Sequence, residues 1–266
     1  MPINNYQDYL SQISLQKAEN FQYNITGSTN AARLMLLSRY FFVVPSTPSL
    51  SIALDNTSPY AINNQSNSLS TSDSLLLTGN FDSLGTHTLI VADLLNISGG
   101  LSAISTTEQT TNLPTAPLTR YTNGEGVFAG LIIWSATGGT IVNASINYTN
   151  QNGVAERISS TPFSASVGGA ITPGRIFLMS LAPEDTGVRS VKSVTLSAST
   201  GTIGNFGVIL FKPLAMMSVS SQPVDSVSTG GFTGSISKIH PNACLSGFLS
   251  PGIGSQLVSG SLFLGQ

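Results

Sequence analysis

Apolar and polar residues alternate along the second half of the chain in the way that β-strands require. In residues 142–148, Val, Ala, Ile and Tyr occupy every second position, and Asn or Ser fills the positions between them. The same period of two recurs in residues 193–198, and it predicts strands with one buried face. Residues 127–135 instead form a nearly continuous apolar run around Trp134, which predicts a strand buried on both faces.

Short turn sequences separate these strands. Residues 150–153 (Asn-Gln-Asn-Gly) and 199–201 (Ser-Thr-Gly) have the composition of tight turns, because Gly and Asn accept positive φ. Further strands are predicted over residues 88–95, 175–181, 206–211, 243–249 and 260–264. Frequent short strands with Gly turns and no helical pattern between them are typical of an antiparallel sandwich. We therefore predict an all-β fold, an antiparallel β-sandwich that is jelly-roll-like, from about residue 86 onward.

The inward-facing positions of these strands predict the core of the sandwich. They share large apolar side chains on the strand period. The predicted core residues are Val127, Leu131, Ile133, Trp134, Ile146, Tyr148, Leu178, Val194, Leu196, Val208, Leu210 and Leu245.

The N-terminal region, residues 1–45, lies outside the strand pattern. Apolar residues three and four positions apart predict one short helix over residues 6–18 and another over residues 31–37. Two helices of this length are marginal alone in water, so they must pack against something. We predict that this arm contacts a partner; the alternative is that it caps the chain's own sandwich. The predicted contact residues are Tyr6, Tyr9, Leu10, Phe41 and Phe42.

Composition divides the rest of the chain near residue 117. Residues 46–117 are rich in Ser, Asn and Thr, and short apolar runs at 49–54 and 75–77 predict edge strands or ordered loop. Two prolines in residues 113–120 mark a linker. We therefore expect an N-terminal helical arm at 1–45, a β and loop region at 46–117, and a sandwich core at 118–266, with 86–117 as an optional further part of that core.

Charge limits what the protein can do. Only 8% of the 266 residues are charged, against about 25% in soluble domains, and the mean hydropathy is +0.22. A surface this poor in charge favours association, so we predict a homo-oligomer. Ten Lys and Arg residues form no basic patch for nucleic acid. We also expect no membrane partner, because no apolar run has the roughly 18 residues of a membrane helix. We expect no signal peptide either.

Residues with catalytic potential are few and scattered. The triplet beginning at Asp185 spells Asp-Thr-Gly, but aspartic-protease chemistry needs two such aspartates, and a turn explains the same letters. His87 and His240 have no positioned Ser or Cys partner, while Cys244 lies in an alternating pattern that predicts a buried structural thiol. No Cys/His cluster or acidic calcium loop is present. We therefore predict no catalytic, cofactor-binding or metal-binding residues and no enzyme activity.

Several segments follow one another in a specific order. They are LTRYTNGEGV at residues 118–127, YTNQNG at 148–153, DTGVRSVKSVTLSASTGT at 185–202, GNFGV at 204–208, KPL at 212–214 and NACL at 242–245. This order resembles a group of tailed-bacteriophage virion structural proteins, over residues 118–249. Within residues 118–249, Glu184 and Arg189 are among the few charges. We expect them to pair locally or across a subunit boundary; a solvated surface pair is the alternative.

The resemblance implies a virion component without enzymatic residues, made in the host bacterial cytoplasm. We predict a capsid decoration or cement protein that bridges and stabilises shell subunits. The alternatives are a tail or neck component, such as a tail-tip or fibre-base protein, and a carbohydrate-binding module for host adsorption. The predicted partners are the major capsid protein or other virion proteins and further copies of the chain, with a trimer preferred by analogy with jelly-roll virion proteins.

Overall fold

The computed structural model describes residues 17–25, 34–36, 47–48, 51–61, 74–83, 87–110, 115–163, 171, 173–219, 238–250 and 256–265. These residues form β-strands and irregular loops without a helix, and neighbouring strands are antiparallel. The prediction of an antiparallel all-β fold is confirmed. The same residues include no helix that could span a membrane.

Fifteen strands are described along the chain. They are β1 (Lys17–Ile25), β2 (Leu34–Leu36), β3 (Ile52–Ala53), β4 (Ser74–Ser83), β5 (His87–Ile97), β6 (Leu101–Ser102), β7 (Phe128–Ser135), β8 (Val142–Asn150), β9 (Arg157–Phe163), β10 (Arg175–Leu178), β11 (Val188–Leu196), β12 (Asn205–Val219), β13 (Lys238–Ile239), β14 (Cys244–Ser250) and β15 (Gln256–Gly265).

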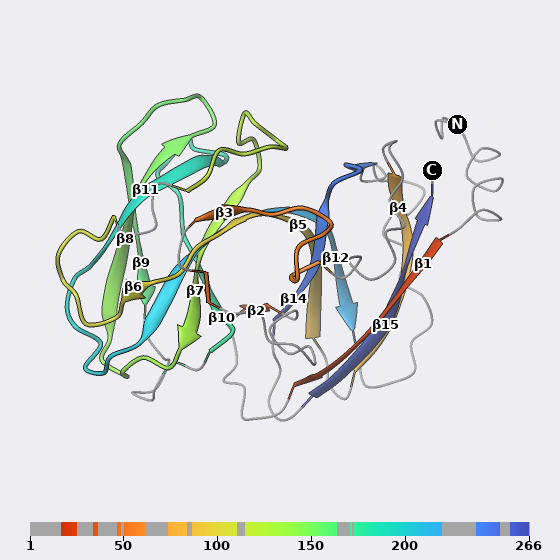
Figure 1. The fold of residues 1–266 in the computed structure, drawn as a ribbon, viewed down its shortest axis with the longest axis horizontal. Coiled ribbons are helices and arrows are strands. Elements are labelled where there is room, and N and C mark those ends of the chain that lie inside the picture. The colour runs from red at the N-terminus through yellow and green to blue at the C-terminus, as the bar shows by residue number, and fades with distance from the viewer. Residues whose placement is uncertain are drawn as a thin grey trace.

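Six strands of the largest sheet close into a ring. The sheet runs β3-β5-β14-β2-β10-β7-β12-β6, and β5 also pairs with β12. The long strand β12 makes this possible, because its first half pairs with β7 and its second half with β5. The ring order is therefore β5-β14-β2-β10-β7-β12, and these strands surround the centre of Figure 1. A second sheet, β11-β8-β9, lies outside the ring beside β7 and β10, and a third has the order β1-β15-β4-β13.

The ring is joined at its shortest strand, β2. Leu36 of β2 pairs with Phe248 of β14, and Leu34 pairs with Ile176 of β10. The prediction of a helix over residues 31–37 is therefore wrong for residues 34–36, because pairing with two distant strands outweighs the local helical pattern. Residues 17 and 18, predicted as the end of the first helix, belong to β1 and pair with β15. The other residues of both predicted helices lie outside the described residues.

Strand β7 separates two hydrophobic cores. Its odd-numbered residues, such as Leu131 and Ile133, pack between the ring and the three-stranded sheet. Its even-numbered residues, Ile132 and Trp134, pack inside the ring. Because successive side chains of a strand point to opposite faces, a strand between two cores must be apolar at nearly every position. The predicted burial of this strand on both faces is confirmed.

The predicted core residues are buried with one exception. Leu178 is 40% exposed, so its assignment to the core was wrong. Alternation along β10 places Phe177 in the core between the sheets, and Leu178 faces the other way at the end of the strand. The apolar run predicts the strand, but it does not show which of two adjacent residues points inward where the strand ends.

The predicted turn at residues 150–153 is confirmed. It joins β8 to β9 as a hairpin, with a 3.0 Å hydrogen bond from Gly153 N to Asn150 O. Gly153 has a φ of +79°, a conformation that glycine adopts without steric cost. The finer prediction of a jelly-roll sandwich is not confirmed, because the described strands form a closed ring with a small sheet against its outside.

Candidate functional site

Three loops from distant parts of the sequence meet at one end of the three-stranded sheet. They are residues 121–127 before β7, 150–157 between β8 and β9, and 179–188 between β10 and β11, and together we call them the loop cluster. Gly126 N donates to Thr186 O at 3.1 Å, and Gln151 N donates to Gly187 O at 3.1 Å. The first three motifs quoted above thus lie in direct contact, although the sequence separates them.

Two long side chains fasten these loops together. The Gln151 Oε1 atom accepts hydrogen bonds from Thr186 N at 3.0 Å and from Gly187 N at 3.2 Å. The Arg189 guanidinium donates to Asn123 O through Nε at 3.1 Å and to Gln151 O through Nη2 at 2.6 Å. Charged donors make strong hydrogen bonds, so Arg189 holds two loops against β11.

The local one of the two pairings predicted for Arg189 is not formed; the pairing across a subunit boundary stays a prediction. The ion pairs within the described residues are Arg120–Asp93, Arg157–Asp185 and Lys192–Glu156. Glu184 is exposed and is not among their partners. The predicted local pairing of Glu184 with Arg189 is absent from the described structure, because backbone carbonyls occupy the guanidinium.

The loops approach so closely that one position requires glycine. A Cβ atom added at Gly187 would lie 1.9 Å from Gly124 O and 2.8 Å from Gly126 N. These distances are far inside van der Waals contact, so any side chain would push the two loops apart. The Gly in the Asp-Thr-Gly triplet is thus explained by backbone packing.

Asp185 of the same triplet accepts three hydrogen bonds. Its carboxylate receives Tyr148 Oη–H, the Asn150 amide at 2.7 Å and the Arg157 guanidinium at 2.9 Å. Burial raises the pKa of Asp185, but these hydrogen bonds lower it more, so the net shift is below the ordinary value. Burial and the bond to Asp185 raise the pKa of Tyr148. The carboxylate thus stays ionised and anchors the loop before β11, as a structural aspartate does.

Backbone strain gathers in the same loops. The non-glycine residues with positive φ in the described chain are Tyr121 at +49°, Glu156 at +59° and Glu184 at +71°. Each belongs to one of the three loops or flanks it directly. Such conformations cost energy and persist where the surroundings enforce them, often at functional sites. The positive-φ non-glycine residues of the described chain thus all lie in the loop cluster.

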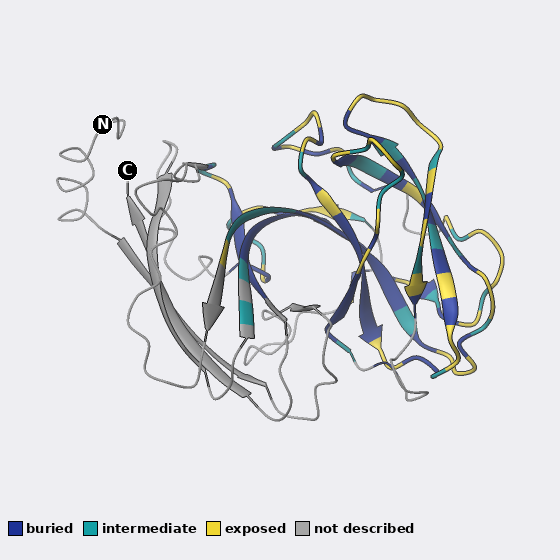
Figure 2. Cartoon of the chain, turned by 180° about the vertical axis from the view of Figure 1, so that it is seen from behind, coloured by how far each residue is buried: buried dark blue, intermediate teal, exposed yellow. Residues whose placement is uncertain are grey.

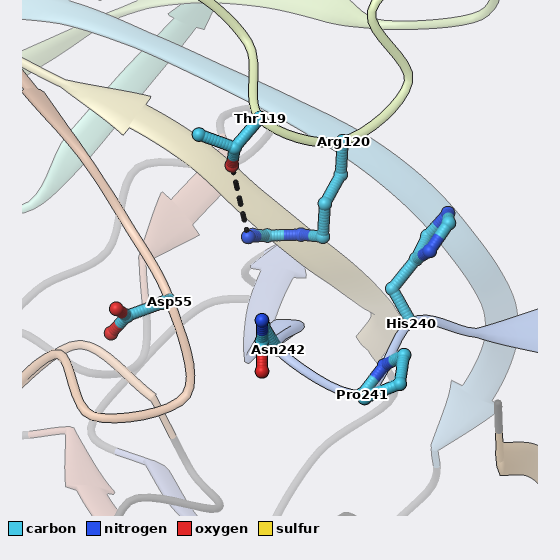
Figure 3. A pocket seen from close by; sticks show the side chains of 6 residues that line it. All are labelled: Asp55, Thr119, Arg120, His240, Pro241 and Asn242. Atoms are coloured by element: carbon cyan, nitrogen blue, oxygen red, sulfur yellow. Dashed lines mark hydrogen bonds between the residues drawn. The ribbon is translucent and has the colours of Figure 1, made fainter. Parts of the chain in front are cut away.

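A pocket of about 330 Å³ lies next to the loop cluster, beneath Arg120 (Figure 3). Its lining residues are Asp55, Thr119, Arg120, His240, Pro241 and Asn242. The lining residue Arg120 belongs to a buried ion pair, in which it donates to Asp93 through Nε at 2.8 Å and through Nη2 at 2.7 Å. Asp93 also accepts Cys244 N at 2.9 Å, so it ties the loop before β7 to β5 and β14.

Burial opposes both charges of this pair. It raises the pKa of Asp93 despite the hydrogen bonds from Arg120. It acts to lower the pKa of Arg120, but the hydrogen bonds and charge of Asp93 outweigh it and raise that pKa. The Arg120 guanidinium donates further to Leu94 O at 3.0 Å and to Thr119 Oγ1 at 3.4 Å. Its donors therefore bind the protein itself rather than face an empty site.

The other groups around the pocket also have local partners. Asp55 accepts Thr57 N at 2.9 Å and so closes its own turn, and its carboxylate points away from Arg120 in Figure 3. His240 stacks edge-on against Tyr121, with 5.0 Å between ring centroids. Cys244 is fully buried, and burial raises the pKa of its thiol well above the ordinary value. The predicted buried position of Cys244 is confirmed, and such a thiol is a poor nucleophile.

The sequence-based contact residues fall elsewhere. Tyr6, Tyr9, Leu10, Phe41 and Phe42 lie outside the described residues, so they stay a prediction. Among the residues that are described, no group of three or more His, Cys, Asp or Glu side chains is placed to hold a metal ion.

The Arg120–Asp93 ion pair was not predicted from the sequence. A signal for it exists, because Asp93 is the one charged residue in the apolar run 87–97. A charge buried in a strand needs a partner of opposite sign. Few cations were available to supply it, and Arg120 is one of them.

No protein-family model matches the chain, and no curated protein matches it. Among solved structures, the VP2 subviral particle of infectious bursal disease virus is similar at 11% identity and a TM-score of 0.21, covering 94% of this chain and 80% of that one. The T=1 particles derived from infectious bursal virus give 12% identity and a TM-score of 0.19, with 94% and 77% covered. At these low scores the likeness supports no argument, so function is inferred from the motifs and the geometry alone.

Proposed function

We propose that this chain is a non-enzymatic structural protein of a bacteriophage virion, most simply a decoration or cement protein that bridges shell subunits. The observation that carries the proposal is the convergence of the motifs behind the sequence resemblance. Segments 118–127, 148–153 and 185–189 meet in the loop cluster, and their polar side chains hold backbone or one another. Shared residues that build a rigid loop surface, rather than a reactive centre, fit a structural family.

The chemistry of the described groups supports the non-enzymatic part. Asp185 is held ionised by three donors, Cys244 is buried with a raised pKa, and the Arg120 donors are occupied. Each of these three groups is committed to holding the fold. A shell protein needs contact area more than chemistry, and specific interfaces bury about 1,600 Å².

Self-association is part of the proposal. Low charge and positive mean hydropathy favour a closed oligomer, and closed symmetry buries such a surface without open-ended growth. We propose a homo-oligomer, with a trimer as the preferred form. A jelly-roll arrangement from about residue 86 onward stays a prediction that an experimental structure would test.

Copy number per virion is the decisive measurement. Quantitative mass spectrometry of purified virions, with a map locating the protein, should give hundreds of copies spread over the head. Six or twelve copies at one vertex or along the tail would instead support the neck or tail alternative. Absence from purified virions would overturn the proposal. Measurable glycan binding by the isolated protein would favour an adsorption module.

The N-terminal arm has its own test. Residues 17–25 form β1 and residues 34–36 form β2, so a deletion of residues 1–16 removes Tyr6, Tyr9 and Leu10 while both strands remain. If the arm contacts a partner, the truncated protein should fold with unchanged thermal stability but lose attachment to virions. If it caps its own core, the melting temperature should fall by several degrees while assembly of the folded fraction persists.

A further inference from the structure

The dipeptide Asn-Gly occurs twice in the chain, and both copies lie in the loop cluster. They are Asn123-Gly124, in the loop before β7, and Asn152-Gly153, in the β8–β9 hairpin. An asparagine that precedes glycine is the kind most prone to deamidation, because glycine has no side chain to hinder the attack of its backbone nitrogen on the asparagine carboxamide. The structure holds these two pairs very differently.

The first pair, Asn123-Gly124, is tightly held. The Asn123 Oδ1 atom accepts a hydrogen bond from Glu125 N at 3.2 Å, and the Asn123 backbone carbonyl accepts one from Arg189 Nε at 3.1 Å. Gly124 is buried, and its nitrogen donates to Tyr121 O at 2.7 Å. A Cβ atom added at Gly124 would lie 2.8 Å from the backbone of β11. The carboxamide and the nitrogen that would attack it are therefore both fixed in place.

The second pair, Asn152-Gly153, is open to solvent. Both residues are exposed, as are the three that follow them, and Figure 2 shows this turn in the colour of exposed residues. Asn150 Oδ1 accepts hydrogen bonds from Asn152 N at 3.0 Å and Val154 N at 2.9 Å, so the backbone of the turn is ordered. The Asn152 carboxamide itself makes no hydrogen bond to the described part of the chain, so it is free to rotate toward the next backbone nitrogen.

One hydrogen bond must open before Asn152 can react. Gly153 N donates to Asn150 O at 3.0 Å, and the same nitrogen has to reach the Asn152 carboxamide. This bond closes an exposed hairpin turn, and bonds at such positions open in local fluctuations. The corresponding bond of Gly124 lies where three loops meet, so opening it requires the loops to separate.

We propose that Asn152 is a site of spontaneous deamidation in the folded protein and that the fold protects Asn123 from the same reaction. Gly153 N attacks Asn152 Cγ, the new N–C bond forms, and the Cγ–Nδ2 bond breaks. The proton of Gly153 N leaves with the amide nitrogen as ammonia. Water then opens the cyclic succinimide at either of its carbonyls and gives aspartate or isoaspartate at position 152.

This modification goes beyond the proposed function, because it changes the charge of the surface with time. The formal net charge of the chain, −2 before the reaction, becomes one unit more negative. The Arg189 guanidinium lies against the turn, since its Nη1 atom would be 3.4 Å from a Cβ atom added at Gly153. The new carboxylate thus forms one residue away from the cation that holds two loops of the cluster together.

Ageing of the purified, folded, full chain tests the proposal. Cleavage after glutamate separates the two pairs into the fragments 109–125 and 126–156. After incubation at mildly alkaline pH, mass spectrometry with fragmentation should find deamidation at Asn152 at least about tenfold faster than at Asn123, because the second site must wait for a larger opening. Equal rates, or a faster reaction at Asn123, would overturn the proposal.

The same incubation in urea is the matched control. Both pairs have the same local chemistry in an unfolded chain, so their two rates should agree within about threefold. A difference that persists in urea would mean that the sequence, and not the fold, protects Asn123, against the proposal. An Asn152 that reacts in urea but stays intact in the folded protein would overturn it as well.

A substitution provides a second measurement. Ageing should produce an acidic species that ion-exchange chromatography separates, and Asn152→Gln should abolish it, because the longer side chain closes the ring far more slowly. Asn143→Gln, at an exposed position of β8, is the control variant and should age like the unmodified protein. Both variants should keep their melting temperature, since both side chains are exposed. An acidic species that persists in Asn152→Gln would place the reaction elsewhere and refute the assignment.

Discussion

Replacing both partners of the Arg120–Asp93 pair should destabilise the protein about as much as replacing either one, and far less than the sum of the two single effects. Asp93 is fully buried, and it accepts two hydrogen bonds from Arg120 and one from Cys244 N. In Asp93→Ala, the guanidinium stays buried without its counter-charge. In Arg120→Met, the carboxylate stays buried with only the Cys244 backbone as donor. Removing one partner of a buried ion pair costs about 3–5 kcal/mol.

The double variant Asp93→Ala/Arg120→Met leaves no buried charge. It loses acceptors for Cys244 N and a donor for Leu94 O, and each unsatisfied backbone group costs about 1–3 kcal/mol. The double variant should therefore lose about as much as one single variant, rather than the sum of both. The expected coupling in the double-mutant cycle is at least about 2 kcal/mol.

Urea unfolding followed by tryptophan fluorescence measures these free energies, because Trp134 lies buried inside the ring. Each single variant should also lower the melting temperature by roughly 10 °C. The comparison variant is Lys192→Met, which breaks the exposed pair with Glu156 at 3.2 Å and should cost about 0–1 kcal/mol.

Two results would refute the reasoning. The first is that the two single effects add within about 0.5 kcal/mol, which would show that the charges do not depend on each other. The second is that Asp93→Ala is no more destabilising than Lys192→Met. Either result would mean that water reaches the Arg120–Asp93 pair and weakens the attraction between its charges.

Three further predictions concern the loop cluster and the core. Asp185→Asn should lower stability at neutral pH by about 2 kcal/mol through weakened bonds from Tyr148 and Asn150. Because the folded-state pKa of Asp185 is lowered, this difference should be complete above the ordinary value of 3.8 and vanish as pH falls below it; a constant difference down to pH 2 in acid titration would contradict it. Gly187→Ala should separate the loops and cost at least about 2 kcal/mol in thermal unfolding, and an unchanged melting temperature would count against the close contact. Cys244 should react with a thiol reagent only on unfolding, since its thiol is buried with a raised pKa; rapid labelling of the native protein would disprove this.

Local pattern was sufficient for the features that depend on a few neighbouring residues. The period of two identified β8 and its buried Tyr148, and the continuous apolar run identified β7 with Trp134. The Asn-Gly turn marked the hairpin at Gly153. These predictions hold because the spacing of apolar residues along a strand indicates whether one or both of its faces are buried.

Features that depend on distant partners were not predictable in this way. Leu34–Leu36 has a helical pattern locally and becomes a strand because β10 and β14 lie on either side of it. The partner of Asp93 lies 27 residues away in a loop. Arg189 was expected to pair with Glu184, yet within the chain it donates to backbone carbonyls of two loops that the fold brings close to it. Spacing along one segment contains no information about which segment will lie beside it.

Closure of the ring at β2 determines when the chain can finish folding. β14 pairs with β2, and all the strands from β3 to β13 lie between the two along the chain, so this whole stretch must leave the ribosome before the two strands can meet. Contacts between such distant segments require loop closure over most of the chain, which slows folding. Until β14 arrives, β5 and β2, the two strands that flank it in the ring, present open edges to other nascent copies, and open edges promote aggregation. The yield of native protein should therefore fall as its rate of synthesis rises.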